Sequence, residues 1–131
     1  MAEIMVPISP GELVDKITIL QIKSERITDA DKLRNVAHEL GLLRETWQAS
    51  AFAGADIEAQ TQSLKSINEA LWDIEDNIRL KEAAAAFDAE FIELARSVYF
   101  TNDKRARVKR EINELLGSKL IEEKSYQDYS H

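Results

Sequence analysis

The stretch DAEFIELARSVYFTNDKRARVKREINELL, residues 88–116, carries the longest apolar pattern in the chain and decides its fold. Phe91, Val98 and Ile112 are spaced by multiples of seven, which places them on one face of a helix. The position that completes this series, seven after Val98 and seven before Ile112, is Arg105. A guanidinium group on a buried face needs a partner. Arg105 is therefore the leading candidate for a functional residue.

Arg105 has three interpretations from the sequence. A helix break at residues 101–103, which are poor helix formers, would turn its side chain away from the core. A structural ion pair, or a side chain that reaches solvent, would satisfy it without any ligand. A role in ligand binding or catalysis is the third interpretation, because buried charges mark functional sites.

The partner of Arg105 is expected on the first helix. If the last two helices form an antiparallel hairpin about Ala85, Arg105 lies level with Ile67 or Asn68, where no acid stands. Glu12 and Asp15 are the candidates on the first helix.

The same hairpin places Glu75 far from Arg105. Glu75 comes level with residues 96–98, so it is expected to pair with Arg96 or to contact Tyr99. Glu75 and Arg79 are also four residues apart and suit a surface ion pair on the third helix.

Four amphipathic segments predict an all-α, four-helix bundle-like fold. Ser9 and Glu12 form a capping box for the first helix, and Thr28 or Asp31 is the expected cap of the second. Apolar stripes cover residues 13–27, 33–47 and 64–78, with a loop expected at 48–56 and a turn at 83–88. The third and fourth helices are expected to form a long antiparallel hairpin, and Gly117 to end the fourth. The polar tail, residues 118–131, is expected to pack on the bundle.

Composition and charge narrow the class of protein. A chain of 131 residues with a 44% hydrophobic content predicts a single helical domain, residues 1–131. A net charge of −7 argues against nucleic-acid partners and anionic membranes. The sequence has no cysteine, no signal peptide and no apolar run long enough to span a membrane, so a cytoplasmic location is expected.

Polar side chains around Arg105 predict a binding module for an anionic small molecule or an acidic partner segment. The expected ligand-binding set consists of Arg105, Lys109, Asn102, Tyr99, Arg96, Glu75, Arg79 and Lys16. Five cations in residues 104–110 could serve an anion, but they lack interleaved aromatics and make a weak nucleic-acid patch. No transition-metal site and no cofactor are expected, because no His, Asp or Glu set has suitable spacing.

Several strings together resemble a bacterial family of small all-helical proteins classed as a domain of unknown function. These strings are ISPGELVDKITILQIKSERI at 8–27, LWDIEDNIRLKE at 71–82, FIELARSVYFTNDKRARVKREIN at 91–113 and GSKLIEEKSY at 117–126. The resemblance covers nearly the whole chain. It implies an all-helical fold in a bacterial cytosol, and it supplies no activity.

Two alternatives to the binding module stay open. Residues 12–15, ELVD, resemble one of the paired acidic motifs with which all-α nucleoside triphosphate pyrophosphohydrolases bind Mg²⁺. Such an enzyme would use Glu12, Asp15, Glu75 and Asp76, although a second motif of good form is missing. The other alternative is a helical scaffold that dimerises, because the apolar faces exceed what one small core buries.

Overall fold

The computed structural model describes residues 3–129, and in that range the chain forms four helices and no strand. The helices are α1 (Pro10–Arg26), α2 (Ala30–Ala49), α3 (Glu58–Ala83) and α4 (Ala89–Leu115). The predicted all-α class and the four helices are therefore confirmed. Residues 1, 2, 130 and 131, which belong to the expected 1–131 domain and 118–131 tail, lie outside the described residues.

Three helices, α1, α2 and α4, begin at side-chain caps, and the cap of α2 differs from the prediction. Ser9 caps α1, where its hydroxyl accepts the Glu12 amide at 3.2 Å. Asp29 caps α2 by accepting the amide of Lys32 at 2.9 Å, so the expected caps Thr28 and Asp31 are wrong. Thr28, Asp29 and Asp31 all carry short acceptor side chains, and the extended backbone of residue 29 selects the middle one of the three.

The fourth helix is continuous through residues 101–103, so the predicted alternative of a break there is wrong. Packing of this long helix against α1 and α3 outweighs the weak helix propensity of those three residues. Gly117, at φ +65°, follows the helix in the left-handed conformation expected of a terminating glycine. The Arg105 side chain consequently stays on the helix face that the heptad spacing predicts.

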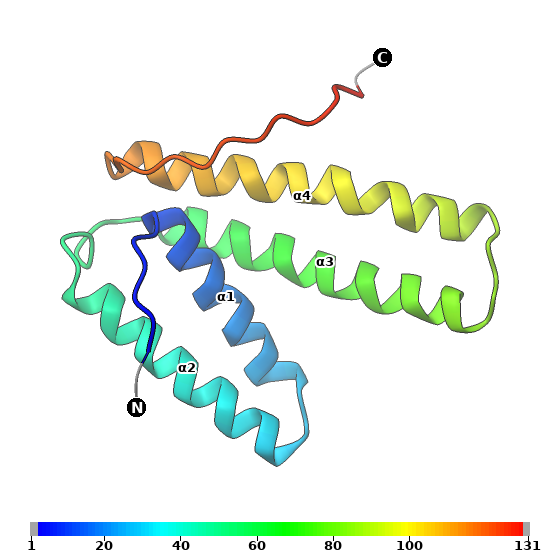
Figure 1. The fold of residues 1–131 in the computed structure, drawn as a ribbon, viewed down its shortest axis with the longest axis horizontal. Helices are drawn as coiled ribbons and strands as arrows, with labels where there is room; N and C mark the ends of the chain where they lie inside the picture. The colour runs from blue at the N-terminus through cyan, green and yellow to red at the C-terminus, as the bar shows by residue number, and fades with distance from the viewer. Residues whose placement is uncertain (1–2, 130–131) are drawn as a thin grey trace.

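Helix α1 is the centre of the arrangement, because it packs against each of the other three helices. Figure 1 shows α3 and α4 side by side as the predicted long hairpin, with α1 across one half of it and α2 beyond α1. The buried core has two clusters. The first consists of Val14, Ile57, Leu64 and Ile112, and the second of Leu20, Val36 and Leu40.

The far half of the α3–α4 hairpin extends beyond α1 and α2 (Figure 1). The apolar stripe of α4 is therefore fully buried at Ile112 but not along its whole length, and Phe87 before the helix is 58% exposed. Leu80 and Ile92 near the same end are exposed as well. None of the described helices is long and apolar enough to cross a membrane.

The C-terminal tail, in its described part 118–129, lies along α4 as predicted (Figure 1). Glu122 pairs with Lys109 at 2.9 Å, and Glu123 pairs with Arg110 at 3.4 Å. Tyr129 donates a hydrogen bond to Asp103. The tail is thus attached to α4 by polar contacts at both of its ends.

Gly11 allows α1 to approach α4 closely. Its amide donates to the side-chain oxygen of Asn113 at 2.7 Å, which satisfies one of the unpaired amides of the first helical turn. A Cβ atom at this position would overlap the backbone carbonyl of Lys109 and lie 2.9 Å from the Asn113 oxygen. Glycine is therefore required here by the contact between two helices.

We expect Gly11→Ala to lower the free energy of unfolding by about 1–3 kcal/mol, because the backbone of α4 must move. Gly41→Ala is the matched control, since nothing lies within 4 Å of a Cβ atom there. That change inside α2 should stabilise the protein by up to about 1 kcal/mol. Urea unfolding measures both, and an unchanged stability for Gly11→Ala would contradict the close approach.

Candidate functional site

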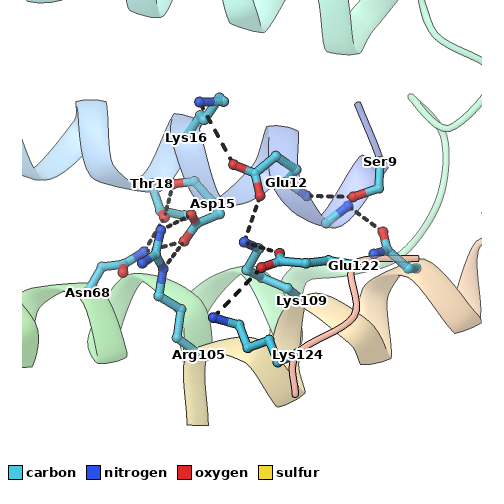
Figure 2. A network of polar contacts seen from close by, with 12 residues as sticks. Ser9, Glu12, Asp15, Lys16, Thr18, Asn68, Arg105, Lys109, Glu122 and Lys124 are labelled. Atoms are coloured by element: carbon cyan, nitrogen blue, oxygen red, sulfur yellow. Dashed lines mark hydrogen bonds and ion pairs between the residues drawn. The ribbon is translucent and has the colours of Figure 1, made fainter. Parts of the chain in front are cut away.

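Arg105 of α4 forms a two-pronged ion pair with Asp15 of α1 (Figure 2). Its Nε donates to one carboxylate oxygen at 2.9 Å, and its Nη2 donates to the other. The Asp15 side chain is 1% exposed, whereas the Arg105 side chain is 29% exposed. The hydrogen bonds to Asp15 raise the pKa of Arg105 above its ordinary value. Of the two candidate partners, Asp15 is therefore the one that Arg105 contacts.

Asn68 and Thr18 complete the surroundings of the Asp15 carboxylate. The amide nitrogen of Asn68 donates to Asp15 Oδ1 at 2.9 Å and to the Thr18 hydroxyl at 3.0 Å. Thr18 in turn donates to the backbone oxygen of Asp15 at 2.8 Å. In the described part of the chain, every buried side-chain nitrogen and oxygen atom has a hydrogen-bond partner. The network is fully satisfied and fixes the plane of the Arg105 guanidinium.

Lys109, one helical turn beyond Arg105, repeats the same kind of contact. Its Nζ lies 2.6 Å from Glu12 of α1 and 2.9 Å from Glu122 of the tail. Burial lowers the pKa of Lys109, but the hydrogen bonds to Glu12 and Glu122 outweigh this and raise it overall. Lys16 lies 3.8 Å from the other oxygen of Glu12. The Glu12 side chain is thus turned toward α4. The predicted capping box is half formed: Ser9 accepts the Glu12 amide, but the Glu12 carboxylate contacts Lys109 and Lys16 in place of the Ser9 amide.

A hollow of about 450 Å³ adjoins the exposed edge of Arg105. It is lined by Ile19, Ile22, Asn68, Leu71, Trp72, Glu75, Asp76, Asn102 and Arg105. The structure therefore brings together three residues of the predicted set, Arg105, Asn102 and Glu75. We call this hollow the Arg105 pocket.

The remaining predicted site residues lie elsewhere. Arg79 pairs with Glu75, which confirms the surface ion pair expected on the third helix. The alternative expectation, that Glu75 pairs with Arg96 or contacts Tyr99, is wrong. Glu75 and Arg79 lie four residues apart on one face of α3, so Glu75 pairs with this neighbour on its own helix in preference to a residue of α4. Arg96 lies 3.6 Å from Glu93 and stacks over the ring of Phe100.

Tyr99, Lys109 and Lys16 also lie outside the Arg105 pocket. Tyr99 packs against Tyr129 of the tail, with 5.1 Å between ring centroids. Lys109 and Lys16 both contact Glu12. The predicted set is therefore spread over three separate environments on α1, α3 and α4.

Sequence reasoning missed Asn68 and Thr18 as members of the network. The signal for Asn68 was present, because the predicted hairpin register sets Arg105 level with residues 67 and 68. Asn68 also interrupts the apolar steps of α3 and is buried with a relative exposure of 6%. Thr18 carried no signal, since a threonine among the apolar residues of α1 is ordinary.

The four carboxylates of the magnesium alternative are not gathered into one site. Glu12 and Asp15 contact Lys109 and Arg105, and Glu75 contacts Arg79. Within residues 3–129, no group of three or more His, Cys, Asp or Glu side chains is arranged to hold a metal ion. Because arginine and lysine side chains already pair with Glu12, Asp15 and Glu75, the geometry does not favour a magnesium-dependent hydrolase.

We expect Arg105→Leu to lower the free energy of unfolding by about 3–5 kcal/mol, because it leaves the buried Asp15 carboxylate without its cation. Adding Asp15→Asn should recover part of the loss, since the uncompensated charge is then removed. Arg34→Leu is the control, because the Arg34–Asp31 pair is exposed on α2 and should contribute less than about 1 kcal/mol. Equal losses at both positions, measured by urea unfolding, would rule out the role given to Asp15.

The tail should loosen in acid. The hydrogen bond from Lys109 holds the pKa of Glu122 below its ordinary value of 4.5. A lowered pKa stabilises the docked tail above pH 4.5, and this contribution is lost as the pH falls through the lowered value. The Tyr129 ring resonances in NMR report docking. In Glu122→Gln they should already be shifted at neutral pH, and an acid transition that persists unchanged in this variant would contradict the assignment.

The model of a protein family matches residues 4–130, a range that contains the whole network and nearly all of the tail. No curated protein and no solved structure matches the chain significantly. The family is described as a family of unknown function, DUF6165, and the chain belongs to it.

Proposed function

We propose that this chain is a binding module for a small molecule that places an anionic group on Arg105. The observation that carries the proposal is the fixed guanidinium at the wall of the Arg105 pocket. Asp15 accepts hydrogen bonds from Nε and Nη2 of Arg105, and 29% of the Arg105 side chain remains exposed. A donor that is held in place before binding loses little entropy when an anion arrives.

The charges around the Arg105 pocket restrict which anions suit it. Asp15 balances the charge of Arg105, and Arg79 balances Glu75. Asp76 lines the pocket and, within residues 3–129, forms no ion pair. A ligand that carries only negative charge would be repelled there. The ligand should therefore combine a carboxylate or phosphate with an ammonium group or another strong hydrogen-bond donor.

The neutral residues of the pocket suit the same kind of ligand. The half-buried Asn102 offers an amide that donates and accepts beside Arg105. Trp72 supplies an aromatic wall, and its ring already carries the Arg26 guanidinium at 5.8 Å. A tryptophan ring attracts cations through its face. These residues support a ligand with a polar anionic end and a cationic end.

Two other occupants follow from separate observations. Glu122 and Glu123 of the tail contact Lys109 and Arg110, which is how an acidic partner segment would bind α4. The exposed apolar end of the α3–α4 hairpin favours a scaffold that dimerises. We prefer the small molecule to both of these occupants. The reason is that the Arg105 pocket adjoins a fully satisfied buried network, which holds the guanidinium in place before a ligand binds.

Fluorescence of Trp72 tests the proposal directly. Trp47→Phe leaves Trp72 as the single tryptophan, at the wall of the Arg105 pocket. The probes are β-alanine, γ-aminobutyrate and aminocaproate, each compared with the diacid and the diamine of similar length. We expect saturable binding of an amino acid of one length, and weaker binding of the matched diacid and diamine. Asp76→Asn should weaken it about tenfold, the loss of one charge-assisted contact.

Asp31→Asn is the matched control, because Asp31 is an exposed helical aspartate outside the pocket and its substitution should leave binding unchanged. Failure of every probe to change Trp72 fluorescence at millimolar concentration would overturn the proposal. Equal binding of the diacid would overturn the requirement for a cationic end. Light scattering on the same samples gives the mass, and a dimer that persists on dilution would support the scaffold instead.

A further inference from the structure

A second hollow, of about 900 Å³, lies between α4 and the C-terminal tail. It is lined by Val98, Tyr99, Asn102, Asp103, Arg107, Lys124, Tyr126, Gln127, Asp128 and Tyr129. Apart from Asn102, none of these residues lines the Arg105 pocket. We call this hollow the tail groove. Because one wall is the tail itself, the groove exists in the docked arrangement of residues 118–129.

Aromatic rings form much of the tail groove. The chain has three tyrosines, and all of them line it. Tyr129 packs on Tyr99 with 5.1 Å between centroids and meets Phe100 edge-on at 4.9 Å. Tyr126 is 79% exposed, and its ring carries the Lys124 ammonium at 5.5 Å. Exposed tyrosines around a hollow supply flat apolar surface with polar edges, which suits an aromatic ligand.

The phenol of Tyr129 keeps the groove in shape. It donates a hydrogen bond to Asp103 of α4, and this bond raises the pKa of Tyr129. The phenol therefore stays protonated at neutral pH, and the Asp103 carboxylate is occupied as an acceptor. Asp103, one of the two acidic residues that line the groove, thus points to the tail.

Cations gather at one end of the tail groove. Arg107 and Lys124 line it and also line an adjoining hollow of about 190 Å³, which Lys109 and Arg110 share. Lys109 and Arg110 are occupied by carboxylates. Arg107 is exposed and, in the described range, forms no ion pair, while Lys124 has a long contact of 3.7 Å with Glu122. Arg107 and Lys124 are thus the cations that a ligand in the groove would meet.

We propose that the tail groove binds a small aromatic anion, whose ring packs among Tyr99, Tyr126 and Tyr129. Its carboxylate or phosphate would lie at Arg107 and Lys124. Charge complementarity selects the anion, because these two cations stand where the two hollows meet. The tyrosines select the ring. This site is distinct from the Arg105 pocket in its lining and in its ligand, so it does not rest on the function proposed above.

The positions of the tyrosines make the test specific. With fluorotyrosine in place of tyrosine, every fluorine label lies in the tail groove and none in the Arg105 pocket. The probes are phenyl phosphate, inorganic phosphate and benzyl alcohol, added to the full chain and followed by fluorine NMR. We expect saturable shifts with phenyl phosphate, and weaker binding of the two fragments, which each lack one half of the recognition.

Arg107→Gln should weaken phenyl phosphate about tenfold, which corresponds to one charge-assisted contact. Lys104→Gln is the matched control, since it removes the same charge from an exposed position on α4 outside the groove. Equal weakening in both variants would overturn the site, because the effect would then be general attraction. Equal binding of inorganic phosphate would overturn the role of the rings, and no saturable shift would overturn the proposal as a whole.

Discussion

The buried carboxylate of Asp15 is the constraint on which the rest of this structure depends. Removing a carboxylate from water costs several kcal/mol, so the fold must surround it with donors. Arg105 supplies two of them and Asn68 a third, and these residues come from α4 and α3. Three helices therefore converge on one side chain. Apolar contacts alone are non-directional, whereas a two-pronged ion pair is satisfied in a single relative position of α1 and α4.

Helix α1 can make these contacts because its first turn comes very near α4. Gly11 has no side chain to hold the helices apart, and its amide is capped across the interface by Asn113. Glu12 and Asp15 follow on the same face and meet Lys109 and Arg105, which are also one turn apart. The close backbone approach and the two ion pairs thus depend on one another. A longer residue at position 11 would move both carboxylates away from their cations.

Local patterns predicted the helices, because apolar spacing and capping residues act within one element. The heptad series singled out Arg105 for the same reason, and Asp15 was one of two partners that the hairpin register allowed. The wrong assignments concern which neighbour a side chain selects. Glu75 was offered to Arg96 or Tyr99 of α4 as well as to Arg79, and it contacts Arg79 on its own helix. Asp29 caps α2 in place of its neighbours. Thr18 and the shape of the Arg105 pocket depend on how three helices cross, which spacing along one chain does not encode.

The cationic run at residues 104–110 shows why charge counts alone do not identify a site. Five cations lie there in an acidic protein, yet three of them, Arg105, Lys109 and Arg110, are held by carboxylates of α1, α4 or the tail. They serve the packing of α4 against its neighbours. Of the remaining two, Lys104 faces solvent and Arg107 lines the tail groove. Five carboxylates, those of Glu12, Asp15, Glu114, Glu122 and Glu123, thus hold three cations of this run. Arg107, which lines the tail groove and has no such partner in the described range, is the cation that the proposed aromatic anion would meet.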